Sequence, residues 1–145
     1  MGTANEAIPF YEPGQRITAH CEAAVVGKRF VDISDPAQSG PGLSSTAEGG
    51  NIVVSPASAG GLVLGVASYD AAIGKKVAVI LGGVVPVVAD GNVTAGQQIE
   101  VGTDGKAKTR TTGLAVGRAL ESASSGADVP VLLYQGVGVE LDTTE

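Results

Sequence analysis

The chain has few of the residues on which catalytic and metal sites are usually built. Its 145 residues include one cysteine, one histidine, no tryptophan and only five aromatic residues, three Tyr and two Phe. A single cysteine, Cys21, excludes an internal disulfide, and its presence as a free thiol favours synthesis in a reducing cytoplasm. One His and one Cys form no zinc ligand set, and the sequence has no acidic calcium-binding loop. We therefore predict no metal and no cofactor.

Long hydrophobic runs and clustered basic residues are also missing. The most apolar run, Val77–Ala89, is shorter than the roughly 20 residues that a membrane-spanning helix needs, and Gly82, Gly83 and Pro86 interrupt it. The N-terminus has neither the basic start nor the apolar block of a signal peptide. The formal charge is −6, whereas nucleic-acid binders present a basic face. We expect no membrane segment and no nucleic-acid partner.

What the sequence does contain is 22 glycines and short apolar segments between turns. Turn signals such as Pro13-Gly14 and Asp104-Gly105 recur at the spacing typical of all-β sandwiches and barrels. We predict an all-β fold, a small barrel or sandwich with at most one or two short helices. Residues 1–15, rich in Pro and Glu, predict an extended N-terminal arm. Residues 16–145 predict a single β domain with an exposed loop at about 35–50.

Several elements can be placed individually. In the segment Arg16–Glu22, apolar and polar residues alternate, which indicates a strand with Ile17, Ala19 and Cys21 on its buried face. The Val-rich run predicts two strands buried on both faces that form the core. Leu114–Ser122 and Ala71–Ile73 are candidates for a helical turn or a short helix. The remaining expected strands are Lys28–Ser34, the Val-rich pair Val77–Leu81 and Val84–Ala89, and a hairpin of residues 98–101 and 107–110.

No group of residues predicts catalysis, and we expect a protein that is not an enzyme. His20 and Cys21 are neighbours on an extended strand and point to opposite faces, so they do not form a base–nucleophile pair; the pattern predicts a buried thiol beside an exposed imidazole. Gly105-Lys106 lacks the remainder of a phosphate-binding loop. Lys106 on its tight turn leaves one alternative, a carrier domain with a modified lysine, although its flanking residues differ from those of biotinyl and lipoyl carriers.

Seven segments carry a family resemblance in their order and spacing. They are Asn5–Gly14, Ile17–Val31, Gly65–Ala72, Lys76–Val79, Val93–Gly105, Val116–Leu120 and Val129–Leu133. In these segments the chain resembles the head decoration (capsid cement) proteins of tailed bacteriophages, especially those infecting actinobacteria. The resemblance covers nearly the whole chain and rests on structural glycines and apolar strands.

The resemblance implies a non-enzymatic protein of the virion that is made in the bacterial cytoplasm. It implies a homotrimer on the outer surface of the capsid, where it binds the major capsid protein and stabilises the lattice against the pressure of packaged DNA. Because buried aromatic and apolar anchors dominate interfaces, the N-terminal arm is the first candidate for the contact with the capsid. The alternative is that the arm folds back on its own barrel. The candidate residues for binding the capsid or another partner are Ile8, Pro9, Phe10, Tyr11, Arg16, Lys28 and Arg29.

A second function class stays open. An acidic, glycine-rich β domain also suits a virion-surface module that attaches to the host cell wall or to carbohydrate. Sugar sites usually contain aromatic platforms, and five aromatic residues provide few of them.

Overall fold

The computed structural model describes residues 16–34 and 52–137. The predicted arm and the predicted loop at 35–50 lie outside the described residues. The described residues consist of ten strands and turns, with one 3₁₀ turn, η1 (Thr103–Gly105). The all-β prediction is confirmed.

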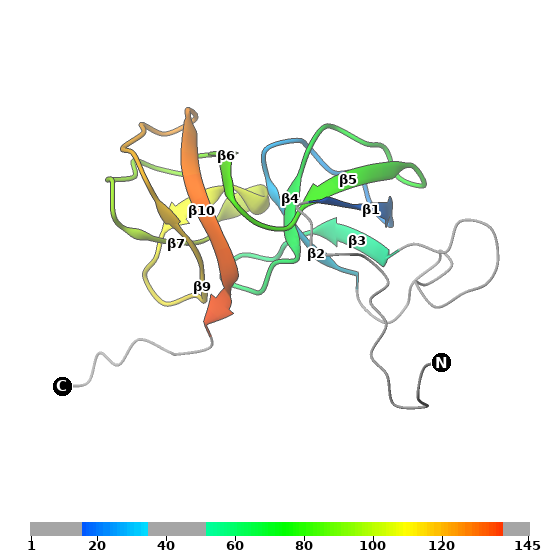
Figure 1. The fold of residues 1–145 in the computed structure, drawn as a ribbon, viewed down its shortest axis with the longest axis horizontal. Helices are drawn as coiled ribbons and strands as arrows, with labels where there is room; N and C mark the ends of the chain where they lie inside the picture. Colours follow the sequence, from blue (N-terminus) through cyan, green and yellow to red (C-terminus); the bar gives the residue numbers. More distant parts are fainter. Residues whose placement is uncertain (1–15, 35–51, 138–145) are drawn as a thin grey trace, which may run out of the picture.

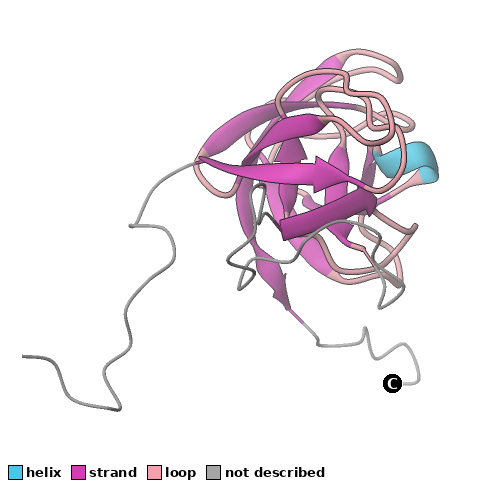
Figure 2. Ribbon diagram, turned by 90° about the vertical axis from the view of Figure 1, so that its right-hand side faces the viewer, coloured by secondary structure: helices cyan, strands magenta, loops and turns pink. Residues whose placement is uncertain are grey.

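The first five strands close into a barrel in the order β1-β3-β2-β4-β5 (Figure 1, right-hand side). The barrel closes because β1 pairs with β3 on one side, in parallel, and with β5 on the other, antiparallel. Figure 2 shows these strands from the barrel side. Their bounds are β1 (Arg16–Cys21), β2 (Phe30–Ile33), β3 (Ile52–Pro56), β4 (Gly65–Ala67) and β5 (Lys76–Ile80).

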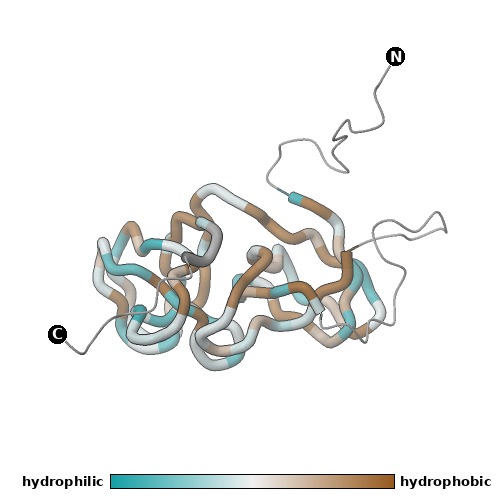
Figure 3. The backbone as a smooth tube through the Cα atoms, turned by 90° about the horizontal axis from the view of Figure 1, so that it is seen from below, coloured by the Kyte–Doolittle hydropathy of each residue, from teal (hydrophilic) through white to brown (hydrophobic). Residues whose placement is uncertain are grey.

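The other five strands form a second sheet in the order β6-β10-β9-β7-β8 (Figure 1, left-hand side). All the pairs within this sheet are antiparallel. In Figure 3 hydrophobic stretches along the chain alternate with paler or hydrophilic turns, as expected for short strands that each bury one face. The bounds are β6 (Val84–Val88), β7 (Gln98–Val101), β8 (Ala107–Thr109), β9 (Ala115–Ala119) and β10 (Asp128–Val137).

The Val-rich run forms the two predicted strands, β5 and β6, but they belong to different sheets. The prediction that both strands are buried on both faces is wrong. Burial alternates along each of them: Val77 and Val79 are buried in β5, and Val85 and Val87 in β6, while Val84 is exposed. The run therefore crosses from the barrel to the second sheet and contributes two buried valines to each.

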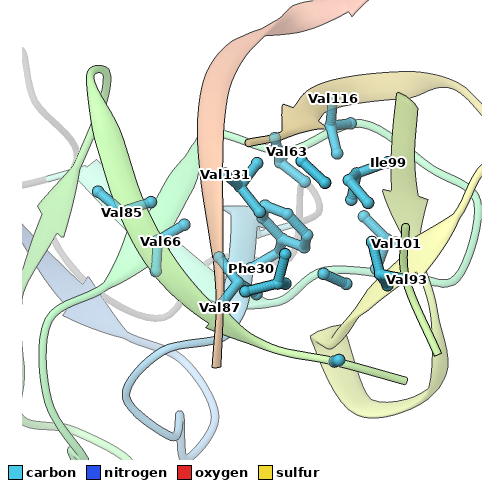
Figure 4. Packing of buried hydrophobic residues seen from close by; sticks show 14 of the residues in the cluster. Phe30, Val63, Val66, Val85, Val87, Val93, Ile99, Val101, Val116 and Val131 are labelled. Carbon is cyan, nitrogen blue, oxygen red and sulfur yellow. The ribbon is translucent and has the colours of Figure 1, made fainter. Parts of the chain in front are cut away.

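The buried side chains form two clusters, and one of them joins the barrel to the second sheet. The smaller cluster fills the barrel and includes Ile17, Cys21 and Val79. The larger one lies under the second sheet but also contains Phe30 of β2 and Val66 of β4. Figure 4 shows the Phe30 ring among valines of both sheets. Because Phe30 is the largest fully buried side chain, much of the contact between the two parts depends on it.

The predicted hairpin is confirmed, with β7 and β8 joined through η1. Asp104 and Gly105 have φ of 56° and 76°, as in the tight hairpin turns that favour an Asp-Gly pair. A Cβ on Gly105 would lie 2.8 Å from the carbonyl oxygen of Phe30. The tip of this hairpin therefore rests directly on barrel strand β2.

Both helix candidates are wrong. The segment Leu114–Ser122 contains strand β9, which pairs with β10 on one side and with β7 on the other. Two strand neighbours satisfy its backbone groups, and this tertiary context overrides a weak helical preference. Ala71 forms an isolated antiparallel bridge with Val25, and the residues after it form a turn.

Candidate functional site

Lys28, a predicted contact residue, lies in the turn before β2 and forms an ion pair within the chain. Its Nζ lies 3.0 Å from Oδ2 of Asp128, the first residue of β10. The Lys28 side chain remains 50% exposed and that of Asp128 45%. Sequence reasoning missed Asp128, because a partner a hundred residues away leaves no local signal.

Arg29, the next predicted residue, lines a hollow of about 200 Å³ between the barrel and the β7–β8 hairpin. The hollow has apolar walls that include Val26 and Phe30, and Asp104 of η1 lies at its border. The Nε of Arg29 is buried and has no hydrogen-bond partner among residues 16–34 and 52–137. Because the guanidinium stays charged in proteins, Arg29 brings a cation to the lining of this hollow.

Arg16 lies apart from the other two cations. It is the exposed first residue of β1 and lines a hollow of about 430 Å³ together with Ile80, Gly82, Val84, Val85 and Pro86. The structure thus places Lys28 and Arg29 together and Arg16 at a separate hollow. The predicted apolar contact residues Ile8, Pro9, Phe10 and Tyr11 lie outside the described residues.

A feature that sequence reasoning missed is an apolar patch on the outer face of the second sheet, on strands β6 and β10. Val84 lies opposite Leu132 in the β6–β10 register, and Pro86 lies opposite Pro130. Leu120 follows β9, and its N–H donates to the carbonyl of Pro130 at 2.9 Å. The one signal in the sequence was Pro86, because a proline within a strand is typical of an edge strand.

Glu100 is a buried acid that sequence reasoning also left without a role. Its Oε1 accepts hydrogen bonds from the backbone N–H groups of Thr111 (2.7 Å) and Gly113 (2.9 Å), and Lys108 Nζ lies 3.7 Å from Oε2. Burial alone would raise the pKa of Glu100, but these backbone hydrogen bonds and the Lys108 charge hold the pKa below its usual value. Glu100 thus fixes the turn between β8 and β9, which is a structural role.

Three residues were considered for catalysis, namely His20 and Cys21 of β1 and Lys106 after the hairpin turn. Cys21 is fully buried in the barrel, and burial raises the pKa of its thiol, partly offset by the charge of Lys76. His20 is half-buried rather than fully exposed, and no hydrogen-bond partner of its Nδ1 lies in the part of the chain that the structure describes. Lys106 follows the hairpin turn, where its N–H donates to Thr103.

Residues 16–34 and 52–137 contain neither a candidate metal site nor a candidate membrane helix. No three His, Cys, Asp or Glu side chains come together as a possible metal site in this part of the chain. Within the same residues no helix has the length and apolar character that a bilayer crossing requires.

The described residues therefore define a small β protein with an apolar surface patch and two hollows lined by basic residues. A family model described as "Phage cement protein" matches residues 11–134, and the chain belongs to this family of structural proteins of the phage head.

A solved structure adds support for the fold. The chain is similar to the head fiber gp8.5 N base of bacteriophage phi29, with a TM-score of 0.63 and 21% identity, over 88% of this chain and 97% of that one. At this identity the likeness concerns the fold. A search of curated proteins finds no match.

Proposed function

We propose that the protein is a capsid cement protein that binds the outer surface of a phage head as a trimer. It adds contacts between neighbouring major capsid subunits and so stabilises the lattice against the internal pressure of packaged DNA. The match of the cement family to residues 11–134 is the observation that carries this proposal.

The mechanism is thermodynamic and needs no reactive group. A protein that binds the intact lattice but not the opened one stabilises the intact lattice by mass action. In a trimer, the first contact raises the effective concentration of the other two binding surfaces. Contacts that are weak individually thereby become strong together, and many such sites on one head add their effects.

The proposed capsid contacts are the N-terminal arm and two cations, Lys28 and Arg29. Arg29 lines the 200 Å³ hollow beside the β7–β8 hairpin, which we call the hairpin hollow. Ile8, Phe10 and Tyr11 supply apolar anchors, and the prolines of the arm reduce the conformational entropy lost on binding. Lys28 and Arg29 approach capsid carboxylates. Arg29 is the stronger candidate, because it belongs to neither of the ion pairs found among the described residues, whereas Lys28 is paired with Asp128.

The test is binding of the purified protein to undecorated capsids, measured by co-sedimentation and by the temperature at which the heads release DNA. We expect the full chain to co-sediment and to raise that temperature. Deletion of residues 1–13 should abolish binding while leaving a folded trimer. A full chain that does not bind capsids contradicts the proposed function; a deletion variant that still binds removes only the arm from it.

A charge-reversal pair tests the cation. Arg29→Glu should weaken capsid binding at least tenfold, because it replaces an attraction by a repulsion at the contact. Lys75→Glu is the matched control: Lys75 is exposed in the turn before β5 and makes the same change of charge away from the hairpin hollow. Equal loss in both variants would mean that overall charge, rather than Arg29, governs binding.

The alternative is a virion-surface module that attaches to cell wall or carbohydrate. The solved structure with a similar fold is a head fiber protein rather than a cement protein, and this observation supports the alternative. Sugar sites usually contain exposed aromatic platforms, and among the described residues Tyr69 is the one aromatic side chain that is more than half exposed. Binding of the purified protein to host cell walls but not to capsids would favour the alternative.

A further inference from the structure

The outer face of strands β6 and β10, together with the residue that follows β9, contains an exposed apolar patch. We name it the Val84–Leu132 face; it consists of Val84, Pro86, Leu120, Pro130 and Leu132. The exposed fractions are 54% for Val84, 45% for Leu120 and 40% for Leu132. The β6–β10 register makes Val84 a neighbour of Leu132 and Pro86 a neighbour of Pro130, and the Leu120 N–H donates to the carbonyl of Pro130. Contiguous apolar residues of this kind on a small protein mark an interaction surface.

The free edge of the sheet at β6 does not offer a site for an added strand. Pro86 has no N–H to donate to a new neighbour. The N–H of Val88 is already used, since it donates to the carbonyl of Lys28 at 3.0 Å. A partner at this position is therefore expected to pack on the face of the sheet rather than to extend it.

The charges around the Val84–Leu132 face favour a second copy of the same chain as the partner. With a formal charge of −6, two copies repel each other wherever their acidic surfaces meet. The Val84–Leu132 face itself contains no acid. The nearest acid in the same register, Asp128, is paired with Lys28. Arg118 borders the face opposite Leu132. Two copies thus meet here without the repulsion expected elsewhere.

The face also lies beside a hollow that it can fill. Val84 and Pro86 belong both to the face and to the 430 Å³ hollow that contains Arg16. Leu120 lies on the side of the face away from this hollow, and the exposed Glu121 follows it. We call Leu120 and Glu121 the Leu120 ridge. Neither Arg16 nor Glu121 belongs to the ion pairs among the described residues. The apolar ridge with Glu121 on one copy therefore complements the apolar hollow with Arg16 on another.

We propose that the Val84–Leu132 face joins copies of this chain, the Leu120 ridge of one copy entering the Arg16 hollow of the next. Such a contact uses two different patches on each copy, and a contact of this kind closes into a ring when its rotation allows. The inference rests on the proposed function in one respect, since it identifies the surface through which the proposed trimer forms.

The test is the molar mass of the purified protein, measured by sedimentation velocity over a wide concentration range. We expect the wild type to have a multiple of the single-chain mass of 14.3 kDa. Leu132→Glu should reduce the mass to that of one chain, with an unchanged β-sheet circular dichroism spectrum. Ile73→Glu is the matched control, because Ile73 is more exposed (68%) and lies in a barrel turn away from this face; it should leave the mass unchanged.

Val84→Asp is a second variant of the same face, in case Leu132→Glu does not fold. Val84 lies on the edge strand and is more than half exposed, so its replacement is expected to disturb the fold less. A folded, single-chain Val84→Asp supports the inference. Face variants that keep the wild-type mass, or a wild type that is itself a single chain, overturn it. Capsid co-sedimentation of the wild type is measured in parallel: binding by the wild type together with face variants of unchanged mass overturns the Val84–Leu132 interface and leaves the cement function standing.

Discussion

Lys28 Nζ and Asp128 Oδ2 lie 3.0 Å apart although a hundred residues separate them in the chain. Their ion pair connects the turn before β2 to the start of β10, and so joins the barrel to the second sheet. Both side chains are about half exposed. We expect Asp128→Asn to lower the free energy of unfolding by less than about 1 kcal/mol, as for other surface ion pairs. Urea denaturation at low and high salt measures this, and the difference should shrink as salt rises.

The backbone of Lys28 gives a second prediction. Its φ is 63°, in the left-handed region that β-branched residues avoid. Lys28→Val should cost roughly 1–3 kcal/mol beyond the lost ion pair, because it adds backbone strain. Lys28→Asn removes the same charge at a residue type that tolerates this conformation, and it is the matched control. Equal stability of the two variants would contradict the role assigned to the backbone.

Glu100 predicts a pH dependence of stability. Its folded-state pKa is lowered by the Thr111 and Gly113 hydrogen bonds and by Lys108. The stabilisation is therefore fully present above the unfolded-state pKa of about 4.3 and is lost as pH falls through the lower folded-state value. Replacement by Gln keeps an acceptor but removes the charge, so Glu100→Gln should cost about 1 kcal/mol at pH 7. The difference between wild type and variant should narrow as pH falls below about 4.

Chemical denaturation of both proteins at neutral and acidic pH measures that difference. Asp70→Asn is a comparison at an exposed acid, whose Oδ1 accepts from a single backbone N–H, that of Gly27 at 2.9 Å. A constant gap between wild type and Glu100→Gln over the whole pH range would remove Glu100 from the pH dependence.

Most of the strands could be predicted because their signals are local. Ile17, Ala19 and Cys21 alternate with polar residues and are all buried in β1, and Asp104-Gly105 forms the expected tight turn. The assignment of β5 and β6 to separate sheets could not be predicted. Both are Val-rich and adjacent in the chain, and their partners, such as β10, lie far away in sequence.

The candidate site was less predictable for the same reason. Basic residues are visible in a sequence, but the pairing of Lys28 with Asp128 and the unpaired Nε of Arg29 depend on long-range packing. The error at Leu114–Ser122 has a related cause. Ala, Leu and Arg favour helices in isolation, and only the neighbours β7 and β10 make the segment a strand.

Cys21 provides a readout of barrel opening. Its side chain is fully buried, and burial raises the pKa of the thiol, so little reactive thiolate is present at neutral pH. We expect a thiol reagent to label Cys21 in the native protein at least a hundredfold more slowly than in urea. Mass spectrometry at timed intervals measures the rate. Fast labelling under native conditions would contradict a closed barrel around β1.

Phe30 tests whether the barrel and the second sheet unfold together. Its side chain is fully buried, belongs to the cluster under the second sheet although β2 is a barrel strand, and lies beneath the tip of the β7–β8 hairpin. Phe30→Ala should lower the free energy of unfolding by about 3–5 kcal/mol, the range for a large aromatic side chain removed from a core. Cys21 labelling then reports on the barrel, and circular dichroism on all the strands. The Phe30 ring belongs to the core that the barrel and the second sheet share. We therefore expect the labelling and circular dichroism transitions to shift to lower urea by the same amount. A shift in only one of the two transitions would show that the two parts unfold independently.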